Sequence, residues 1–519
     1  MTAPAAAEGV RAALRDTVRD DAAARARALL VARLAIALYL VELLLNLLRP
    51  HVLPDEPTLS IFQKAAGSEG SVGRLLATPQ AVFWTLLAGI AAGAALQAFV
   101  LVTRPDERRA RALTWAIIGV LLLPFGLIPL VVVGSYPGQA LACVPGTAFV
   151  LWLLHHAQRL ARIPLAMLLV AFGWGALIVF GLGRAYSNLA FGTINGFVLK
   201  GHKSDLAGQI HTQYRVIDGM LVHLALVNAL LVAAGVVLLL ALFRHRVTDA
   251  VTGLVLGAAI GLGYNLVESV LFIRLYGLFS AFNGATGGFE YWIRQSIGLL
   301  GGQVAFGAVL GAGIGLAAQA RDRGRRLRIA LPALAAAFSG AVATETLAAW
   351  LSHLAHDHIS VGGPLDTLIV SPFFWLLPQA PFFLVAVLLL VHGTRVRAAA
   401  ARAAVSAETS TSPAITPQEA PFLVDPAVRF WTLVGTWRLQ GWSGMRTLRR
   451  LQTAQLDLAA WRWRHPDPTG EEGNALRAKV MRLKAGPVPP APMPPPPRPP
   501  APPAQAPAPP APRPGEAAS

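Results

Sequence analysis

The chain has 519 residues, 55% hydrophobic and only 14% charged, whereas soluble domains carry about 25% charged residues, so a domain facing water on all sides is excluded. The formal net charge of +17 is spread over short loops between apolar runs, a pattern that marks membrane topology, so no nucleic acid is expected as a partner. The single cysteine, Cys143, excludes an intrachain disulfide and any site built from several cysteines.

Ten apolar runs follow one another along the chain. A bilayer core of roughly 30 Å requires about 20 predominantly apolar residues in a helix. The runs lie near residues 28–48, 81–103, 114–134, 138–154, 164–183, 219–243, 251–276, 297–320, 329–352 and 373–393. The sequence therefore predicts an all-α fold, a polytopic transmembrane bundle of about ten helices.

The loops between the runs predict the orientation of the bundle. Arginines follow every even-numbered run, namely Arg104, Arg108, Arg109, Arg111, Arg159, Arg162, Arg244, Arg246, Arg321, Arg323, Arg325, Arg326, Arg328, Arg395, Arg397 and Arg402. Cytoplasmic loops carry the excess of Lys and Arg, so both termini are expected in the cytoplasm. Pro145 and Gly146 interrupt the fourth run, but its removal would break this alternation.

Composition divides the chain into six segments. They are a cytoplasmic N-terminal segment (1–27), an N-terminal four-helix unit (28–154), a six-helix core (155–393), a linker (394–425), a cytoplasmic Trp/Arg-rich helical segment (426–485) and a Pro/Ala-rich tail (486–519). The tail is expected to be disordered. A basic, Trp-bearing helix such as that in 426–485 can lie among lipid headgroups, and a helical hairpin packed on cytoplasmic loops is the alternative.

Polar side chains inside the runs mark a candidate site, because such groups are costly at membrane depth. At a rise of 1.5 Å per residue, Glu268, Gln303 and Glu345 each lie roughly 7–8 Å outward from the midpoints of their runs. Asn228 lies roughly 4–5 Å outward, and His223 is nearer the surface. We expect a shared polar cavity in the outer half of the bilayer, and separate polar contacts between neighbouring helices are the alternative.

Glycines at four-residue spacing lie on the faces that carry these polar groups. They are Gly253, Gly257 and Gly261 in one run and Gly307, Gly311 and Gly315 in another. Small residues at this spacing let helix backbones approach closely in lipid. We therefore expect Tyr264, Glu268 and Gln303 on packed faces, whereas Glu42 and Asn46, at the outer end of the first run, are expected to be interfacial.

One of these runs resembles a known family. The stretch Gly257-Ala-Ala-Ile-Gly-Leu-Gly-Tyr-Asn-Leu-Val-Glu268-Ser-Val-Leu-Phe272 resembles the signature helix of the PrsW intramembrane metalloproteases, which reads Gly-Leu-Gly-Phe-x-x-x-Glu-Asn followed by an aromatic residue. The segments Pro164–Gly175 and Arg294–Gly315 also resemble family helices in order and spacing. The resemblance covers roughly residues 155–355.

This resemblance implies a zinc-dependent protease of the bacterial cytoplasmic membrane that cuts single-pass membrane substrates, such as anti-sigma factors, within the bilayer. Glu268 matches the family's glutamate and is the implied catalytic residue, with Tyr264 in place of a Phe. Gln303 stands where the family has a His, and Glu345 lies near the place of its last His. The implied metal set is therefore a degenerate one of Glu268, Gln303 and Glu345. The helix that should carry a paired-Glu motif has no acid, and Asn228 lies near that place.

These departures favour a PrsW-like relative with an inactive metal site that acts by binding membrane partners. On that interpretation no cofactor is expected, and the partners are the lipid bilayer and single-pass membrane proteins. An active zinc protease is the alternative, and a transporter-like helical bundle is a further one. The His, Asp and Glu ligands that zinc prefers are mostly replaced here, and Gln is a poor substitute for them.

Overall fold

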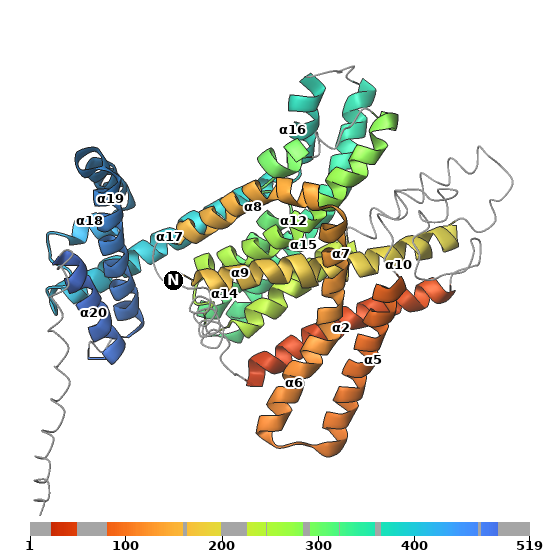
Figure 1. Cartoon of the computed structure of the whole chain (residues 1–519), viewed down its shortest axis with the longest axis horizontal. Coiled ribbons are helices and arrows are strands. Elements are labelled where there is room, and N and C mark those ends of the chain that lie inside the picture. The colour runs from red at the N-terminus through yellow and green to blue at the C-terminus, as the bar shows by residue number, and fades with distance from the viewer. Residues whose placement is uncertain are drawn as a thin grey trace, which may run out of the picture. The chain divides into compact units, whose positions relative to one another are not determined.

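The computed structural model describes residues 22–48, 80–158, 163–198, 226–244, 246–283, 291–320, 322–358, 365–465 and 469–485. Within these ranges the chain forms helices and turns and no strand (Figure 1). The predicted all-α fold is confirmed. Two compact units, Met1–Ala400 and Ala401–Ser519, are described separately below.

The first unit is built from apolar helices. In chain order these are α2 (Ala22–Leu48), α5 (Gln80–Thr103), α6 (Glu107–Leu122), η1 (Leu123–Gly126), α7 (Leu127–Ser135), α8 (Pro137–Ala157), α9 (Leu165–Trp174), η2 (Gly175–Val179), α10 (Phe180–Val198), Leu226–Leu242, α12 (Ala250–Asn283), η3 (Ile293–Ile297), α14 (Gln303–Gln319), α15 (Arg323–His358), η4 (Asp366–Val370), α16 (Ser371–Leu376) and α17 (Ala380–Thr409), which ends in the second unit.

Eight segments of the described chain are long and apolar enough to cross a membrane. They are Ala22–Leu48, Gln80–Thr103, Glu107–Ser135, Pro137–Ala157, Leu165–Ala190, Ala250–Arg274, Arg323–Thr344 and Ala380–Thr409. The helices Leu226–Leu242 and Gln303–Gln319 are apolar but shorter. Each of the ten predicted runs coincides with one of these segments, so the predicted polytopic bundle is confirmed, with eight helices of full spanning length.

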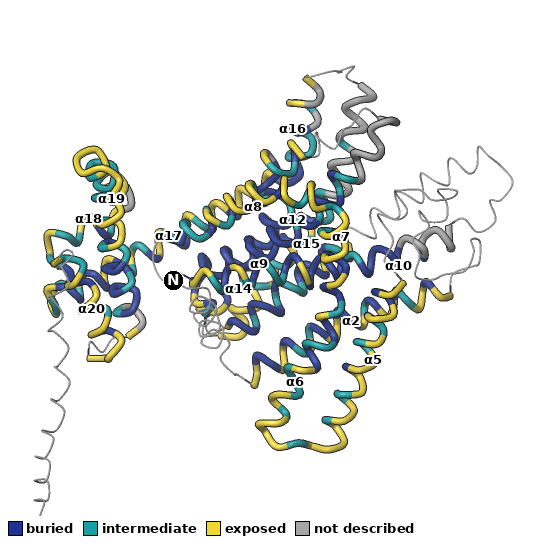
Figure 2. Tube along the Cα trace, viewed as in Figure 1, coloured by how far each residue is buried: buried dark blue, intermediate teal, exposed yellow. Residues whose placement is uncertain are grey.

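Helix α12 lies at the centre of the first unit, and its apolar stretch is 89% buried (Figure 2). On one side it packs against α14 through glycines. A Cβ atom at Gly257 would collide with the carbonyl oxygen of Gly307, and one at Gly253 with that of Gly311. The converse also holds for Gly307 and Gly311. The close backbone contact predicted from the glycine spacing is therefore confirmed.

The opposite side of α12 packs equally closely against α9 and η2. A Cβ atom at Gly175 would collide with the carbonyl oxygen of Ile260, and one at Gly263 with that of Phe172. Because backbone contacts hold α12 on two sides, the depth of its polar residues is fixed by two neighbouring helices.

The N-terminal helices expose much of their apolar surface. Only 17% of the apolar stretch of α5 is buried, and Leu101 and Val102 near its end are 76% and 83% exposed. Soluble proteins rarely expose such continuous apolar surface, and a lipid bilayer provides the matching environment for it. These helices thus indicate that the first unit is embedded in a lipid bilayer.

Glu42 and Asn46 are buried, and the expectation that they are interfacial is wrong. Each is only 1% exposed. The hydroxyl of Tyr186 donates to Oε2 of Glu42 at 2.9 Å, and Nδ2 of Asn46 donates to the carbonyl oxygen of Leu189 at 2.7 Å. Polar contacts therefore join α2 to α10, although the two helices are far apart in the sequence.

The second unit holds the end of α17 together with α18 (Ala420–Val424), α19 (Pro426–Arg464) and α20 (Glu471–Lys484). The segment 394–425, expected as a linker, continues α17 to Thr409 and then contains α18. Nε of Arg477 donates to Glu408 at 2.6 Å, and this hydrogen bond raises the pKa of the Arg477 guanidinium. Residues 1–21 and the tail 486–519 lie outside the described residues.

Candidate functional site

Glu268, on α12, forms an ion pair with Arg294. Its Oε2 accepts a hydrogen bond from Nη1 of Arg294 at 3.2 Å, and the two side chains are 17% and 16% exposed. The Arg294 guanidinium also lies 4.3 Å from the ring centroid of Phe272, one helical turn beyond Glu268. Arg294 belongs to the π-helical turn η3. The carboxylate is thus part of an ion pair with an aromatic residue beside it.

Tyr264 and Asn228 meet at Gly183 of α10. A Cβ atom at Gly183 would lie 3.3 Å from Oδ1 of Asn228 and 3.7 Å from the hydroxyl oxygen of Tyr264. The hydroxyl of Ser187 donates to the carbonyl oxygen of Gly183 at 2.8 Å and lies 3.4 Å from Oδ1 of Asn228. The Tyr264 ring packs edge-on against Phe180. The structure therefore brings together two of the predicted residues.

Arg184 follows Gly183 directly on α10, next to this group of polar side chains. Arg184 and Ser187 were not predicted as site residues, since the fifth apolar run ends at residue 183 and α10 continues to Val198. The polar spacing of Arg184, Ser187 and Asn188 at the end of that run was the only available signal.

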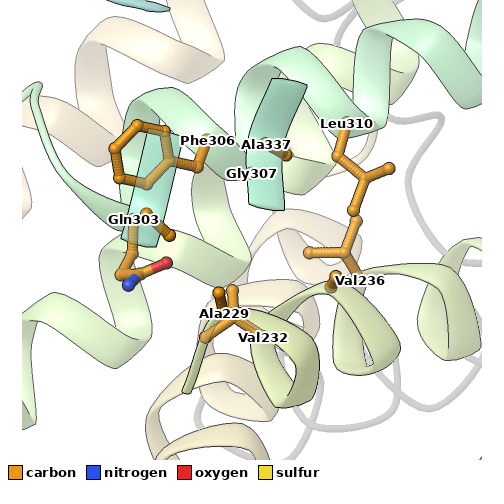
Figure 3. A pocket seen from close by; sticks show the side chains of 10 residues that line it. Ala229, Val232, Val236, Gln303, Phe306, Gly307, Leu310 and Ala337 are labelled. Carbon is orange, nitrogen blue, oxygen red and sulfur yellow. The ribbon is translucent and has the colours of Figure 1, made fainter. Parts of the chain in front are cut away.

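Gln303 begins α14 and lines a small, otherwise apolar pocket (Figure 3). The side chain is 6% exposed, and its Oε1 accepts no hydrogen bond from the described chain. Val232, Phe306 and Ala337 are among the residues that close the pocket. It offers about 10 Å³ for the centre of a water molecule, and a single water needs roughly 10–15 Å³. The pocket is therefore at the lower limit of this size, and Gln303 is the polar side chain that lines it.

Glu268 and Gln303 do not share this pocket. A Cβ atom at Gly261 would collide with the carbonyl oxygen of Gln303, so Gln303 lies level with Gly261. Glu268 is two helical turns further along α12, roughly 10 Å away along its axis. The expected common depth is absent for this pair, because α14 packs against α12 with Gln303 opposite Gly261.

The remaining predicted residues are described only in part. Glu345 lies on α15, but its side chain is outside the described residues, as is the whole of His223. The neighbouring Thr344 donates its hydroxyl to the carbonyl oxygen of Gly340 at 2.9 Å. The position of Glu345 relative to Glu268 therefore stays a prediction.

The side chains placed by the structure do not fit a zinc centre. Protein zinc sites use at least three Cys, His, Asp or Glu ligands, and among the described residues no three such side chains lie close enough together to hold a metal ion. Glu268 is paired with Arg294, and Gln303 is a neutral amide facing an apolar pocket. Neither is available as an anionic ligand in this arrangement.

Comparison with known proteins supports the resemblance seen in residues 257–272. Residues 163–386 match the family model described as PrsW family intramembrane metalloprotease. No curated protein and no solved structure matches the chain. The match covers less than half of the chain, from just before α9 into α17, and it includes Glu268, Arg294 and Gln303. The segment 163–386 of this multi-pass membrane protein is therefore similar to the PrsW family of intramembrane metalloproteases.

Proposed function

We propose that the PrsW-like segment is a catalytically inactive relative of the family, which binds single-pass membrane proteins without cutting them. The observation that carries this proposal is the ion pair between Glu268 and Arg294. The Arg294 cation competes with a metal ion or a proton for this carboxylate. Hydrogen bonds to charged groups contribute about 1.5–3 kcal/mol each, so this competition opposes catalysis.

The described side chains of the neighbouring helices supply no replacement for the missing ligands. Gln303 is a neutral amide, and the helix Leu226–Leu242 contains no Asp, Glu or His. A general base must lie within hydrogen-bond reach of the proton that it accepts, and the described residues hold no group of three His, Cys, Asp or Glu side chains that could combine metal ligands with such a base. A PrsW-like helix bundle without the metal ligands can still bind the transmembrane helix of a single-pass membrane protein.

Zinc analysis tests this proposal. We expect substoichiometric zinc in the detergent-purified protein and the same content in Glu268→Gln, because the carboxylate is engaged by Arg294 and not by a metal. A co-expressed single-pass membrane protein should co-purify intact with both variants. Stoichiometric zinc in the wild-type protein, lost in Glu268→Gln together with cleavage of that membrane protein, would overturn the proposal.

An active zinc-dependent protease is the second candidate, and the match of residues 163–386 to a metalloprotease family favours it. On this alternative, Glu345 and His223, whose side chains are not described, would have to complete the ligand set. The variant Glu345→Gln separates the two candidates, since it should leave zinc content unchanged in an inactive relative and abolish zinc binding in a protease.

We also propose that the protein resides in the bacterial cytoplasmic membrane with both termini in the cytoplasm, as the alternation of basic loops indicates. In a Cys143→Ala background, which removes the only cysteine, Ser204→Cys should react with an impermeant thiol reagent in intact cells. Arg323→Cys should react only after the cells are permeabilised. Labelling of both sites from the same side would contradict this topology.

A further inference from the structure

The first part of α19 exposes a stripe of large apolar side chains. We call residues 426–442 the anchor segment. Phe430, Leu433, Val434 and Trp437 follow the i, i+3, i+4, i+7 spacing of one helix face. Phe430 and Trp437 are 57% and 51% exposed, and the adjacent Trp431 is 65% exposed. Three large aromatic side chains are thus uncovered on a single short helix.

A second strip of the anchor segment, beside the apolar stripe, is polar and carries Arg429, Thr432, Thr436 and Gln440. The side directly opposite the apolar stripe carries Val428 and Leu439, which are 38% and 87% exposed. Five arginines, Arg429, Arg438, Arg446, Arg449 and Arg450, lie between residues 426 and 456, and this stretch contains no Asp or Glu. The Arg446 guanidinium lies 5.1 Å from the ring centroid of Trp442. A helix with aromatic and basic faces of this kind is typical of the lipid interface.

The second part of α19 differs, because it forms the core of its own unit. Gly441 has a φ of +69°, which favours glycine, and it interrupts the helix between the two parts. Beyond it, Trp461 is 3% exposed and contacts Gly473 of α20, and Leu458 is fully buried. The aromatic residues of the anchor segment are therefore not needed to build this core.

We propose that the anchor segment lies in the headgroup region of an anionic membrane surface. Phe430, Trp431 and Trp437 enter the acyl boundary, and the arginines bind lipid phosphates. The net positive charge of residues 425–456, which hold five arginines and one aspartate, matches an anionic surface, and Trp favours the membrane–water interface. The segment begins 17 residues after Thr409, where the helix with the candidate span of α17 ends, so the chain keeps the segment near a bilayer and raises its effective concentration there.

The full-length protein in lipid nanodiscs tests this proposal. In the Cys143→Ala background, Val434→Cys places an environment-sensitive fluorophore on the apolar stripe, and Thr436→Cys places it on the polar face as a matched control. Nanodiscs of phosphatidylcholine are compared with nanodiscs that also contain phosphatidylglycerol. In the anionic discs we expect the Val434→Cys label to shift its emission to the blue, to be quenched by spin-labelled lipid, and to be several-fold less accessible to iodide than the Thr436→Cys label.

Removing arginines or adding salt shows whether lipid phosphates are what protects the Val434→Cys label from iodide. Replacing Arg429, Arg438 and Arg446 together by Gln, or raising the salt concentration, should reduce the quenching by spin-labelled lipid, because screening weakens the attraction to lipid phosphates. Equal iodide access of both labels in anionic discs would overturn the proposal. Protection of the Val434→Cys label without quenching by spin-labelled lipid would instead indicate a protein contact, and would also overturn it.

Discussion

Replacing Gly257 by alanine is expected to destabilise the first unit severely. The new Cβ atom would collide with the carbonyl oxygen of Gly307, and the next nearest atoms are also backbone, so no flexible side chain can move aside. Overpacking of a core costs typically 1–3 kcal/mol and occasionally more, and here two buried helices must separate. We expect a clear loss of thermal stability in detergent for Gly257→Ala and a failure to accumulate for Gly257→Leu.

Gly173→Ala is the matched control, because Gly173 is also a helical glycine of the bundle but a Cβ atom there meets nothing within 4 Å. Alanine is favoured over glycine in a helix interior by up to about 1 kcal/mol, so this variant should melt at the wild-type temperature or slightly above. If Gly257→Ala and Gly173→Ala melt alike, the backbone contact between α12 and α14 is not as described here.

The helices and the close contact between α12 and α14 could be predicted from the sequence alone, because both depend on local patterns. Apolar runs of spanning length predict helices without knowledge of their neighbours. Glycines at four-residue spacing place small residues on one helix face, as Gly253 and Gly257 do opposite Gly311 and Gly307. The match of residues 163–386 to the PrsW family likewise confirms a resemblance carried mainly by one helix.

The candidate site was less predictable, because its contacts depend on partners and helix ends that no local pattern specifies. The ion pair joins Glu268 to a π-helical turn in another part of the chain. Depths estimated from apolar runs placed Gln303 level with Glu268, but in the structure Gln303 packs against Gly261, two helical turns from Glu268. Glu42 occupies the end of a run, and its burial depends on a contact with Tyr186 on α10 that no local pattern indicates.

The contacts of Arg397 could not be predicted from the sequence either, because its position after the tenth run is consistent with a solvated cytoplasmic loop. In the structure it is only 3% exposed and forms a buried ion pair with Asp249, which precedes α12. Its Nε and Nη2 donate to Asp249 at 2.6 and 2.7 Å, and Nη2 also donates to Thr252 at 2.6 Å. This contact links α17 to the start of the central helix.

Breaking this ion pair is therefore expected to destabilise the first unit by about 3–5 kcal/mol, the usual cost of leaving one member of a buried pair uncompensated. Arg397→Met should show the full loss, and Arg395→Met, at an exposed position of the same helix, should stay close to wild type. Denaturation of the purified protein in mixed micelles measures both variants under identical conditions.

The double variant Asp249→Asn, Arg397→Met shows whether Arg397→Met destabilises the protein by leaving Asp249 without its partner charge or by removing side-chain packing. Removing both charges leaves no uncompensated ion, so the double variant should lose less stability than the sum of the two single variants. Asn at position 249 can still accept the hydrogen bond that the backbone N–H of Thr252 donates to Asp249 Oδ1 at 2.8 Å, so the start of α12 stays capped. Strictly additive losses, or an Arg397→Met variant as stable as Arg395→Met, would show that the pair does not hold α17 against α12.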